Sequence, residues 1–448
     1  MIKEAEAGGR ARQLVAWLDS LPLNRNHWLV FSLCAAGLLF DAFDLLMVSF
    51  IAPEIMLEWS LTPQVLGVVI SATVFGMLFG TYVLGTLSDV IGRRAGFQVT
   101  VAIFSFFSGL GAAAQNVMQF AAVRFCTGVG IGGFIPVDTA VMAEYLPARR
   151  RGALLALGAI FFPIGGFLAA GIAALVMPAF GWRGLLLIGV VPAVLILVFR
   201  RLVPETPRFL MAKGRLVEAE RSIAWIARET PPPATQSDIT ATPDLAVARR
   251  SPVAELFSRT YRRRTVVAWS LWFFWAFPYY GLILWLPTLL TKYLNVPQAT
   301  VFFYMMGFQI AGMTGRLVML TLVDRLGRKP VIIGSGLCAG VLLLMFGWQQ
   351  DLAGLIFVGY LLAFFHDGGF SGIVPYTPEL YPTHARSTGV GWASGAGRIA
   401  AMLAPITVGF LVAAQSVYAV FVMFALSYLV AAVVVALIGV ETKGKALE

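Results

Sequence analysis

The chain alternates between long apolar runs and short polar segments. A helix of about 20 apolar residues crosses a bilayer core about 30 Å thick, and runs of that length recur along the whole sequence. We expect membrane helices at residues 28–52, 64–88, 95–114, 117–140, 152–176, 182–202, 266–291, 300–322, 329–348, 353–375, 387–412 and 416–438. The longest polar segment divides them equally. The pattern therefore predicts an all-α membrane protein whose twelve transmembrane helices form two six-helix bundles, at 28–202 and 266–438.

Composition supports lipid as the main solvent of the chain. Of its 448 residues, 59% are hydrophobic and 12% are charged, whereas soluble domains have about 45–50% apolar and about 25% charged residues. The net charge of +10 lies in short segments between apolar runs rather than on one soluble face, which argues against nucleic acid as a partner. Cys34, Cys126 and Cys338 are widely spaced inside apolar runs, which argues against a disulfide framework or a zinc site.

Charge asymmetry predicts the orientation. Segments after even-numbered helices are rich in basic residues, namely Arg93, Arg94, Arg149, Arg150, Arg151, the stretch 249–264, Arg325, Arg328, Lys329 and Arg386. Segments after odd-numbered helices carry little beyond Glu54, Glu58, Lys292 and Asp351. Because cytoplasmic loops are enriched in Lys and Arg, we expect a protein of the inner membrane with both termini, 1–27 and 439–448, in the cytoplasm. The segment 203–265, with prolines at 231–233, is expected to be a cytoplasmic linker with a short surface helix at 216–228.

Two sequence motifs occur once in each predicted half. Gly-Thr-Leu-Ser-Asp-Val-Ile-Gly-Arg-Arg at 85–94 follows the second helix, and Leu-Thr-Leu-Val-Asp-Arg-Leu-Gly-Arg-Lys at 320–329 follows the eighth. Glu-Tyr-Leu-Pro at 144–147 leads to Arg151, and Glu-Leu-Tyr-Pro at 379–382 leads to Arg386. Such internal symmetry is typical of duplicated bundles that rock against each other.

Opposite charges in these motifs predict ion pairs at the cytoplasmic helix ends. We expect the pairs Asp89–Arg93, Glu144–Arg151, Asp324–Arg328 and Glu379–Arg386, with Gly85 packed closely beside the first of them. Pairs that form in only one state shift the equilibrium between states, so these residues are expected to act as a gate. The alternative is that basic residues only fix the topology, and we favour it for Arg94, Arg149 and Lys329.

These motifs resemble the signature of the major facilitator superfamily over nearly the whole chain. Pro-Glu-Thr-Pro-Arg-Phe-Leu at 204–210, with Gly-Trp-Arg at 181–183, is similar to its sugar-porter-like and organic-ion branches. The resemblance implies a secondary transporter built of two pseudo-symmetric six-helix bundles around a central substrate path. Leu320 departs from the pattern because the first motif has Gly85 at that position, so looser packing is expected in the second half.

Ionisable residues inside membrane helices call for an explanation, because insertion scales put their cost at about 2.5–3.5 kcal/mol each. We single out Asp41, Asp44, Arg124, Asp138, His366, Asp367 and Arg398. Asp44 and Arg124 are expected to form an ion pair. In proton-coupled sugar porters, which this half resembles, an aspartate of helix 1 and an arginine of helix 4 occupy the matching motif positions, and the aspartate carries the proton. The alternative is a static pair. Asp41, on nearly the same helical face, is a second proton candidate, and Asp138 is assigned to the gate.

Arg398 lies near the middle of the eleventh predicted helix and needs an anionic partner, because guanidinium does not lose its proton there. Asp367 would be a structural partner; a substrate carboxylate, bound bidentately, would be a functional one. The stretch 379–405 resembles aromatic-acid/proton symporters and organic-ion transporters, including bacterial niacin permeases. That resemblance implies an organic-anion substrate at Arg398.

Aromatic residues of the seventh predicted helix are candidates for a wall of the substrate site. Trp275 precedes a proline break, and Tyr279 and Tyr280 follow it; broken helices in transporters line cavities. A flat ring with a carboxylate suits an aromatic wall opposite an arginine, with Gln309 and His366 as hydrogen-bonding groups. The alternative for each aromatic residue is ordinary packing.

We expect secondary active transport rather than enzyme activity, since the sequence has no nucleotide-binding phosphate loop. The first hypothesis is proton symport of a small aromatic monocarboxylate such as nicotinate, benzoate or a hydroxybenzoate. Sugar/proton symport or drug/proton antiport is the alternative, and a non-transporting ligand sensor is a second one. The expected partners are the small organic anion, protons and the lipid bilayer, and the protein is expected to be a monomer without a metal or other cofactor.

Overall fold

The computed structural model describes the chain except for residues 1, 230–251, 350, 383–384, 415 and 444–448. The prolines at 231–233 and the arginines at 249 and 250 lie outside the described residues. The helices are α1 Ile2–Ser20, α2 Arg25–Glu58, α3 Pro63–Ile91, α4 Arg93–Gly111, α5 Val117–Tyr145, α6 Ala148–Gly158, α7 Phe161–Ile188, α8 Ala193–Leu202, α9 Pro207–Ala212, α10 Leu216–Ala227, α11 Pro252–Leu256, α12 Arg262–Thr288 continued by a π-helical turn Leu289–Tyr293, α13 Gln298–Leu326, α14 Arg328–Trp348, α15 Leu352–Gly368, α16 Phe370–Glu379, α17 Arg386–Ala413 and α18 Val417–Ile438.

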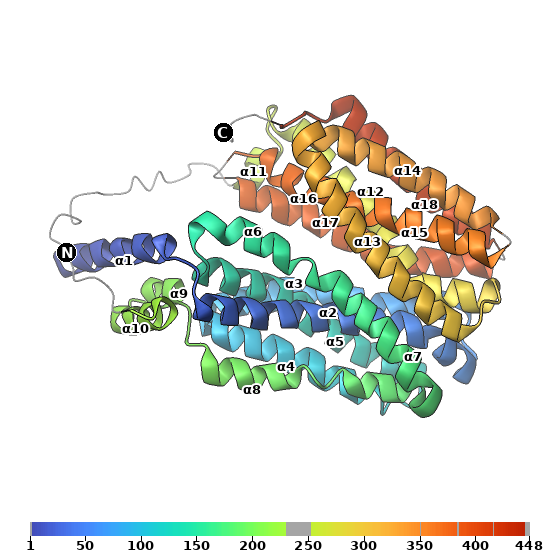
Figure 1. Ribbon diagram of the computed structural model, residues 1–448, viewed down its shortest axis with the longest axis horizontal. Helices are drawn as coiled ribbons and strands as arrows, with labels where there is room; N and C mark the ends of the chain where they lie inside the picture. The colour runs from blue at the N-terminus through green and yellow to red at the C-terminus, as the bar shows by residue number, and fades with distance from the viewer. Residues whose placement is uncertain (1, 230–251, 350, 383–384, 415, 444–448) are drawn as a thin grey trace.

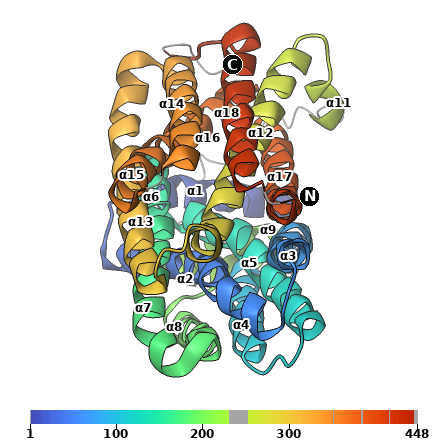
Figure 2. The same cartoon turned by 90° about the vertical axis from the view of Figure 1, so that its right-hand side faces the viewer.

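The long helices form two bundles that lie side by side (Figure 1). Helices α2 to α8 make one bundle and α12 to α18 the other, as the end-on view also shows (Figure 2). The short helices α1, α9, α10 and α11 gather at one end, drawn at the left in Figure 1. This end also carries the repeated sequence motifs and is called the motif end below; the opposite end is called the far end. The short helix expected at 216–228 corresponds in position to α10.

Among the described residues, ten helical segments are long and apolar enough to cross a membrane. One of them, 148–202, runs to the far end and back (Figure 1). It is interrupted at Gly181, whose φ of +62° suits glycine, and again between α7 and α8. Helix α4, predicted at 95–114, is 19 residues long and is not among the ten. The all-α membrane fold is therefore confirmed. Twelve membrane crossings are reached when α4 is counted as one crossing and the segment 148–202 as two.

Both copies of the first motif lie inside helices, although the sequence places them in loops. Asp89 belongs to the last turn of α3 and Arg93 begins α4, so Gly92 alone forms the turn, with a φ of +105°. Gly327 has the same φ between α13 and α14. A side chain at either position would be strained and would meet a carboxylate from another segment, Glu205 or Glu441 respectively. The helices thus extend past the apolar runs by several residues.

The bundles pack closely against each other in the half of the molecule nearer the far end. A Cβ atom at Gly67 of α3 would lie 2.5 Å from the carbonyl oxygen of Pro405 in α17, and one at Gly409 would lie 2.5 Å from that of Pro63. Ser71 donates a hydrogen bond to the carbonyl oxygen of Met402 at 2.8 Å. Farther out, Gln298 of α13 donates to Glu54 of α2 at 3.1 Å. These contacts close the far end.

Residues before the first long helix form a helix that is fixed to the first bundle, a feature that the polar sequence of 1–27 does not predict. Arg10 of α1 pairs with Glu220 of α10 at 2.7 Å. The side chain of Asn24 accepts hydrogen bonds at the start of α2 and donates one to the last turn of α10, at the carbonyl oxygen of Ile226. Helices α1 and α10 therefore belong to the same rigid unit as α2.

Replacing Gly67 with valine should prevent closure of the far end, because the new side chain would overlap the backbone of α17 at Pro405. Spin labels at Leu57 and Ala299, on the two sides of this end, should then report a longer distance in an electron paramagnetic resonance measurement. Gly334→Val is the matched control, since a Cβ atom there meets nothing within 4 Å. An unchanged distance in the Gly67 variant would show that the α3–α17 contact does not hold the end closed.

Candidate functional site

Asp44 of α2 and Arg124 of α5 form the predicted ion pair inside the first bundle. Their side chains are 1% and 0% exposed, with Arg124 Nη2 3.2 Å from Asp44 Oδ2. The other carboxylate oxygen of Asp44 accepts a hydrogen bond from Ser108, and Arg124 Nε donates to Thr73 at 3.2 Å. Both carboxylate oxygens of Asp44 are therefore used, and a buried pair of this kind is costly to open, since one charge would remain unpaired.

Asp41 lies three residues earlier on α2 and is also completely buried. Neither of its carboxylate oxygens accepts a hydrogen bond from the residues that the structure describes. The charges that act on it come from Asp44, from Arg398 of the other bundle and from Asp138. Asp41 is thus a carboxylate of the first bundle on which a positive charge of the second bundle, that of Arg398, acts.

Arg398 lies on α17 and is partly buried. Within the described part of the chain, no carboxylate lies within ion-pair distance of its guanidinium, and the groups on which its charge acts are Asp41 and Tyr280. The sequence left open whether Asp367 would be its structural partner. The structure excludes this alternative, because Asp367 is bound to another arginine.

That arginine is Arg316 of α13, which the sequence analysis missed. Its Nη2 and Nε atoms donate to Asp367 Oδ1 at 2.6 and 3.0 Å, and its guanidinium lies 5.7 Å from the ring centre of Phe370. Gly312 lets the carboxylate approach, since a Cβ atom there would lie 2.4 Å from Asp367 Oδ2. The available signal was an arginine inside the apolar run 300–322.

The predicted aromatic residues form a layered cluster rather than a single wall. The ring of Tyr279 stacks on His366 at 4.6 Å, with an angle of 11° between the rings, and contacts Tyr280 edge-on. His366 shares a hydrogen bond with Tyr428, and the indole of Trp275 donates to the carbonyl oxygen of His366 at 3.1 Å. Trp275 and His366 are completely buried behind Tyr279, whereas Tyr280 is only partly buried. Tyr280 is therefore the member nearest to the space between the bundles.

Gln309 of α13 lies at the interface between the bundles. It is buried, and a Cβ atom at Gly166 of α7 would lie 2.4 Å from its Nε2 atom. Its amide therefore reaches the first bundle through a gap that a glycine leaves. Gln309 and Arg398 approach the first bundle from two different helices, and Asp41 is the charged group that faces them.

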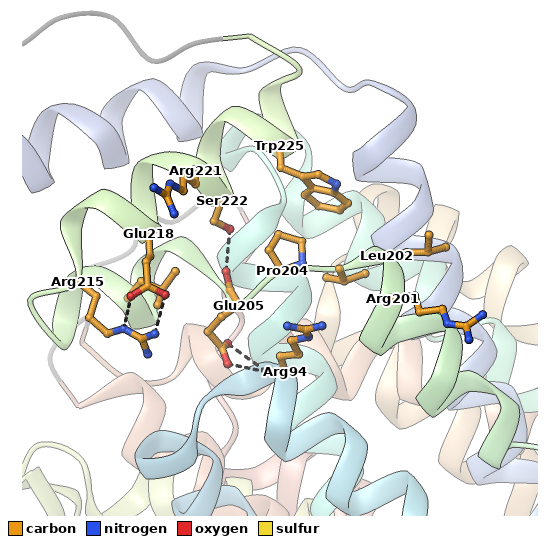
Figure 3. Close-up of a pocket in the computed structure, with 12 residues that line it drawn as sticks. Arg94, Arg201, Leu202, Pro204, Glu205, Arg215, Glu218, Arg221, Ser222 and Trp225 are labelled. Carbon is orange, nitrogen blue, oxygen red and sulfur yellow. Dashed lines mark hydrogen bonds and ion pairs between the residues drawn. The ribbon is translucent and has the colours of Figure 1, made fainter.

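At the motif end, four segments of the first bundle are joined by a polar network. Arg93 pairs with Asp89, as predicted, and also with Glu144 at 2.9 Å. Glu144 accepts a hydrogen bond from Thr206 at 2.6 Å, and Glu205 accepts one from the backbone N–H of Arg93 at 2.9 Å. Figure 3 shows Glu205 beside Arg94 at a cavity of about 510 Å³. The network connects α3, α4, α5 and the segment before α9.

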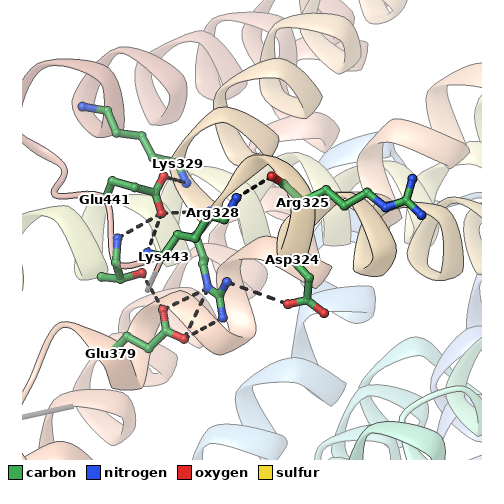
Figure 4. Close-up of polar contacts among 8 residues, drawn as sticks. Asp324, Arg325, Arg328, Lys329, Glu379, Glu441 and Lys443 are labelled. Carbon is green, nitrogen blue, oxygen red and sulfur yellow. Dashed lines mark hydrogen bonds and ion pairs between the residues drawn. The ribbon is translucent and has the colours of Figure 1, made fainter. Parts of the chain in front are cut away.

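The second bundle repeats this network around Glu441, which lies beside Arg328 and Lys329 (Figure 4). The sequence analysis missed Glu441 and its neighbour Thr442. Arg328 pairs with Glu379 at 3.1 Å and with Asp324 at 3.8 Å. Glu441 accepts hydrogen bonds from the backbone N–H groups of Arg328 and Lys329 at 3.1 and 3.0 Å, and Thr442 donates to Glu379. The signal was available, because Glu-Thr follows the last helix of each half, at 205–206 and 441–442.

Two of the predicted gate pairs are wrong. Arg151 pairs with Asp19 at 2.6 Å instead of with Glu144. The chain turns after Tyr145 and continues as α6, so Arg151 faces the end of α1. In the second bundle Glu379 is bound by Arg328 rather than by Arg386, which begins α17.

Gly85 does not have the close contact expected of it. A Cβ atom there would lie 3.5 Å from Pro136, an ordinary van der Waals distance. Leu320, at the matching position of the second bundle, is 48% exposed. The difference between the two motif copies is therefore a surface feature rather than a change in close packing.

The pKa values of the two matching glutamates are shifted in opposite directions. Burial raises the pKa of Glu205, outweighing hydrogen bonds from the backbone N–H groups of Thr206, Arg94 and Arg93. Burial also opposes the charge of Glu441, but there the N–H groups of Lys443, Arg328, Lys329 and Thr442 outweigh it and lower the pKa. Relative to a glutamate in water, the surroundings thus stabilise the carboxylate form of Glu441 and destabilise that of Glu205.

Comparison with known proteins identifies the family. A family model described as "Sugar (and other) transporter" matches residues 46–448. The chain belongs to this family. The niacin transporter NiaP of Acinetobacter baylyi is 35% identical, covering 97% of this chain and 99% of that protein. The gallate transporter of Pseudomonas putida is 32% identical, covering 88% of this chain and 87% of that protein.

A solved structure shows the same fold as this member of the sugar transporter family. The partially occluded inward open conformation of the xylose transporter XylE from E. coli has a TM-score of 0.75 at 18% identity, covering 95% of this chain and 100% of that one. At this identity the likeness shows the fold alone. The expected membership of the major facilitator superfamily is confirmed, and the protein is a multi-pass membrane transporter rather than an enzyme.

Glu441→Gln should destabilise the protein more than Glu205→Gln, because the surroundings stabilise the carboxylate form at Glu441 and destabilise it at Glu205, relative to a glutamate in water. Hydrogen bonds to charged groups contribute about 1.5–3 kcal/mol, and solvent at the half-buried Glu441 reduces this to about 1 kcal/mol. Thermal unfolding in detergent at neutral pH would measure the difference. Equal losses in both variants, or a larger loss for Glu205→Gln, would contradict the assignment of charge.

Proposed function

We propose that the protein imports a small aromatic monocarboxylate, of the nicotinate, benzoate or hydroxybenzoate type, together with a proton across a bacterial inner membrane. The observation that carries this proposal is the charge of Arg398. It lies between the two bundles, it cannot be lost by deprotonation, and no carboxylate among the described residues lies within ion-pair distance of it. A substrate carboxylate supplies the missing anion.

The surroundings of Arg398 suit a flat ring that bears a carboxylate. Guanidinium binds a carboxylate through two parallel hydrogen bonds, and Tyr280 lies close enough for the charge of Arg398 to act on it. Tyr279 stands beside Tyr280 and is held in place by His366 behind it. Relatives named as transporters of niacin, gallate and 4-hydroxybenzoate support an aromatic acid as the substrate class.

Arg316 is less suitable as the first contact of the substrate. Its charge is already matched by two hydrogen bonds to Asp367, and its guanidinium lies near the ring of Phe370. A second anion would have to compete with a buried carboxylate that is already in place. We therefore assign Arg316 and Asp367 to the wall of the site. Arg398 is assigned as the residue that binds the substrate carboxylate.

The proton is assigned to Asp41 rather than to Asp44. Asp44 is bound by Arg124 and Ser108, so binding a proton there would break a buried pair. Asp41 has no hydrogen-bond donor among the described residues, and Arg398 is the opposite charge that acts on it. A proton on Asp41 would leave the charge of Arg398 available to the substrate.

Electroneutrality then explains the coupling. Without cargo, Asp41 and Arg398 balance each other; with both cargoes, neutral Asp41 faces an Arg398 that the substrate carboxylate neutralises. Either cargo alone leaves an unbalanced charge between the bundles, and burying such a charge is costly. The change between the outward-open and inward-open states is thus favoured for the empty protein and for the protein that carries both cargoes.

The basic residues of the motif end indicate that this end faces the cytoplasm. The far end would then face outward, and its closure by the α3–α17 contacts corresponds to a state open toward the cytoplasm. In this orientation, proton symport delivers the acid into the cell.

The alternatives fit the central charge less well. A neutral sugar gains no ion pair from Arg398, and a cationic drug would be repelled by it. A sensor would bind the same acids as a transporter but would not move them. Flux into proteoliposomes separates these cases, since a sensor shows binding without accumulation.

Arg398→Ala should weaken binding of benzoate or nicotinate by roughly 10- to 150-fold, the effect of losing a charge-assisted hydrogen bond of about 1.5–3 kcal/mol. Isothermal titration with the purified protein would measure it. Arg325→Ala, which removes an exposed arginine at the motif end, is the control and should bind normally. Normal affinity in the Arg398 variant would refute the proposal that Arg398 binds the substrate carboxylate.

Asp41→Asn should abolish accumulation driven by a pH gradient while retaining exchange of labelled for unlabelled substrate, because the asparagine mimics a permanently neutral Asp41. Transport of labelled nicotinate in proteoliposomes would measure both. Asp351→Asn is the matched control, since this far-end residue caps α15 and asparagine caps equally well. Gradient-driven accumulation at the wild-type level in Asp41→Asn would exclude Asp41 as the proton carrier.

A further inference from the structure

Asp138 of α5 is a buried carboxylate that the proposed transport cycle does not use. It is completely buried, and neither of its oxygens has a hydrogen-bond partner within normal limits among the described residues. The sequence assigned it to the gate. The gate contacts of α5 are instead made by Glu144, six residues closer to the motif end, so Asp138 needs a different explanation.

The neighbour of Asp138 is the thiol of Cys34 on α2. Cys34 and Asp41 are seven residues apart, which is close to two helical turns, so they lie on the same face of α2. The rise of 1.5 Å per residue puts them about 10.5 Å apart along the helix. Asp138 acts electrostatically on Asp41 from the neighbouring helix. The two carboxylates therefore lie along one line, with Asp138 nearer to the motif end.

The charged side chains on the other helices around Asp138 lie at the motif end, and several of them are bound in ion pairs. Besides α2, helices α3, α4, α6 and α9 pack against α5. Their charged residues all lie at the motif end, namely Asp89, Arg93, Arg94, Arg149, Arg150, Arg151 and Arg208. Asp89 and Arg93 bind each other, and Arg151 and Arg208 bind Asp19. The titratable groups that interact with Asp138 inside the bundle are thus Cys34 and, about two helical turns farther along α2, Asp41.

We propose that Asp138 is a second proton-carrying residue, which passes the proton between Asp41 and the motif end. The proposal rests on the proton symport proposed above. The proton leaves the carboxyl group of Asp41, Asp138 changes from carboxylate to carboxylic acid, and it returns to carboxylate when the proton passes to water at the motif end. Because Cys34, the neighbour of Asp138, lies about 10.5 Å along α2 from Asp41, farther than the length of a hydrogen bond, water would carry the proton from Asp41 to Asp138. The thiol of Cys34 faces the carboxylate form as a weak hydrogen-bond donor.

A buried carboxylate suits this role for a physical reason. An unpaired charge is costly at bilayer depth, whereas the neutral acid costs far less, so a proton is readily accepted when it arrives. Ionisable chains of Asp, Glu and His form proton relays in membrane transporters. A structural role would instead require the two oxygens to be bound, as those of Asp44 are.

The test compares Asp138→Asn with Asp138→Glu in proteoliposomes to which labelled nicotinate is added from outside. Asp138→Asn should lose accumulation driven by a pH gradient but keep substrate exchange and benzoate affinity. Asp138→Glu should restore accumulation, because it restores an exchangeable proton. Ser105→Ala, which removes another buried polar group of the same bundle, should behave as wild type. Wild-type accumulation in Asp138→Asn would overturn the relay.

A second measurement is independent of the substrate. Infrared difference spectra of the purified protein between two pH values should contain a C=O band of a carboxyl group that gains a proton. This band should be absent in Asp138→Asn and shifted in Asp138→Glu. An unchanged band in both variants would overturn the relay, whereas failure of the wild type to accumulate any of the three acids would overturn the proposed function instead.

Discussion

A positive charge held between two bundles in a membrane protein has to be balanced, and this requirement organises the centre of the structure. Arg124 is balanced by Asp44 and Arg316 by Asp367, each inside its own bundle. Arg398 has no such partner among the described residues, and the carboxylate on which it acts, Asp41, belongs to the other bundle. The balance of Arg398 therefore depends on how the bundles are placed and on what lies between them. A transporter needs this property, because its cargo has to change the relative stability of its states.

The ends of the bundles are built for a different purpose. At the motif end, Glu205 and Glu441 each bind the backbone at the start of a helix and connect segments of a single bundle. These networks make each bundle rigid. At the far end, glycines such as Gly67 and Gly409 let α3 and α17 approach through their backbones. The α3–α17 contacts can form and separate together without any change inside either bundle. Movement therefore occurs between rigid bundles rather than within them.

The sequence predicts much of this arrangement, because lipid imposes simple rules. Apolar length identifies the long helices, and the repeated motifs identify the duplication. Asp44 and Arg124 were predicted as a pair because they carry opposite charges at a similar depth of two helices in the same half. Arg316 was missed although it obeys the same rule, and its omission left Asp367 as a candidate partner for Arg398.

Other features depend on geometry that the sequence does not carry. The contact of Arg151 with Asp19 arises because α1 folds back onto the first bundle. The burial of His366 and Trp275 behind Tyr279 depends on side-chain stacking, so residue type alone could not separate lining residues from supporting ones. The same limit applies to Asp41, because only its unbound oxygens distinguish it from Asp44.

Proton uptake during substrate binding tests the central claim most directly. Titrating the purified protein with benzoate in two buffers of different ionisation enthalpy reports the number of protons exchanged. If the substrate carboxylate takes the place of Asp41 beside Arg398, binding takes up protons, and the apparent heat depends on the buffer. A heat of binding that is the same in both buffers would show that the two anions do not share Arg398, and would contradict the account.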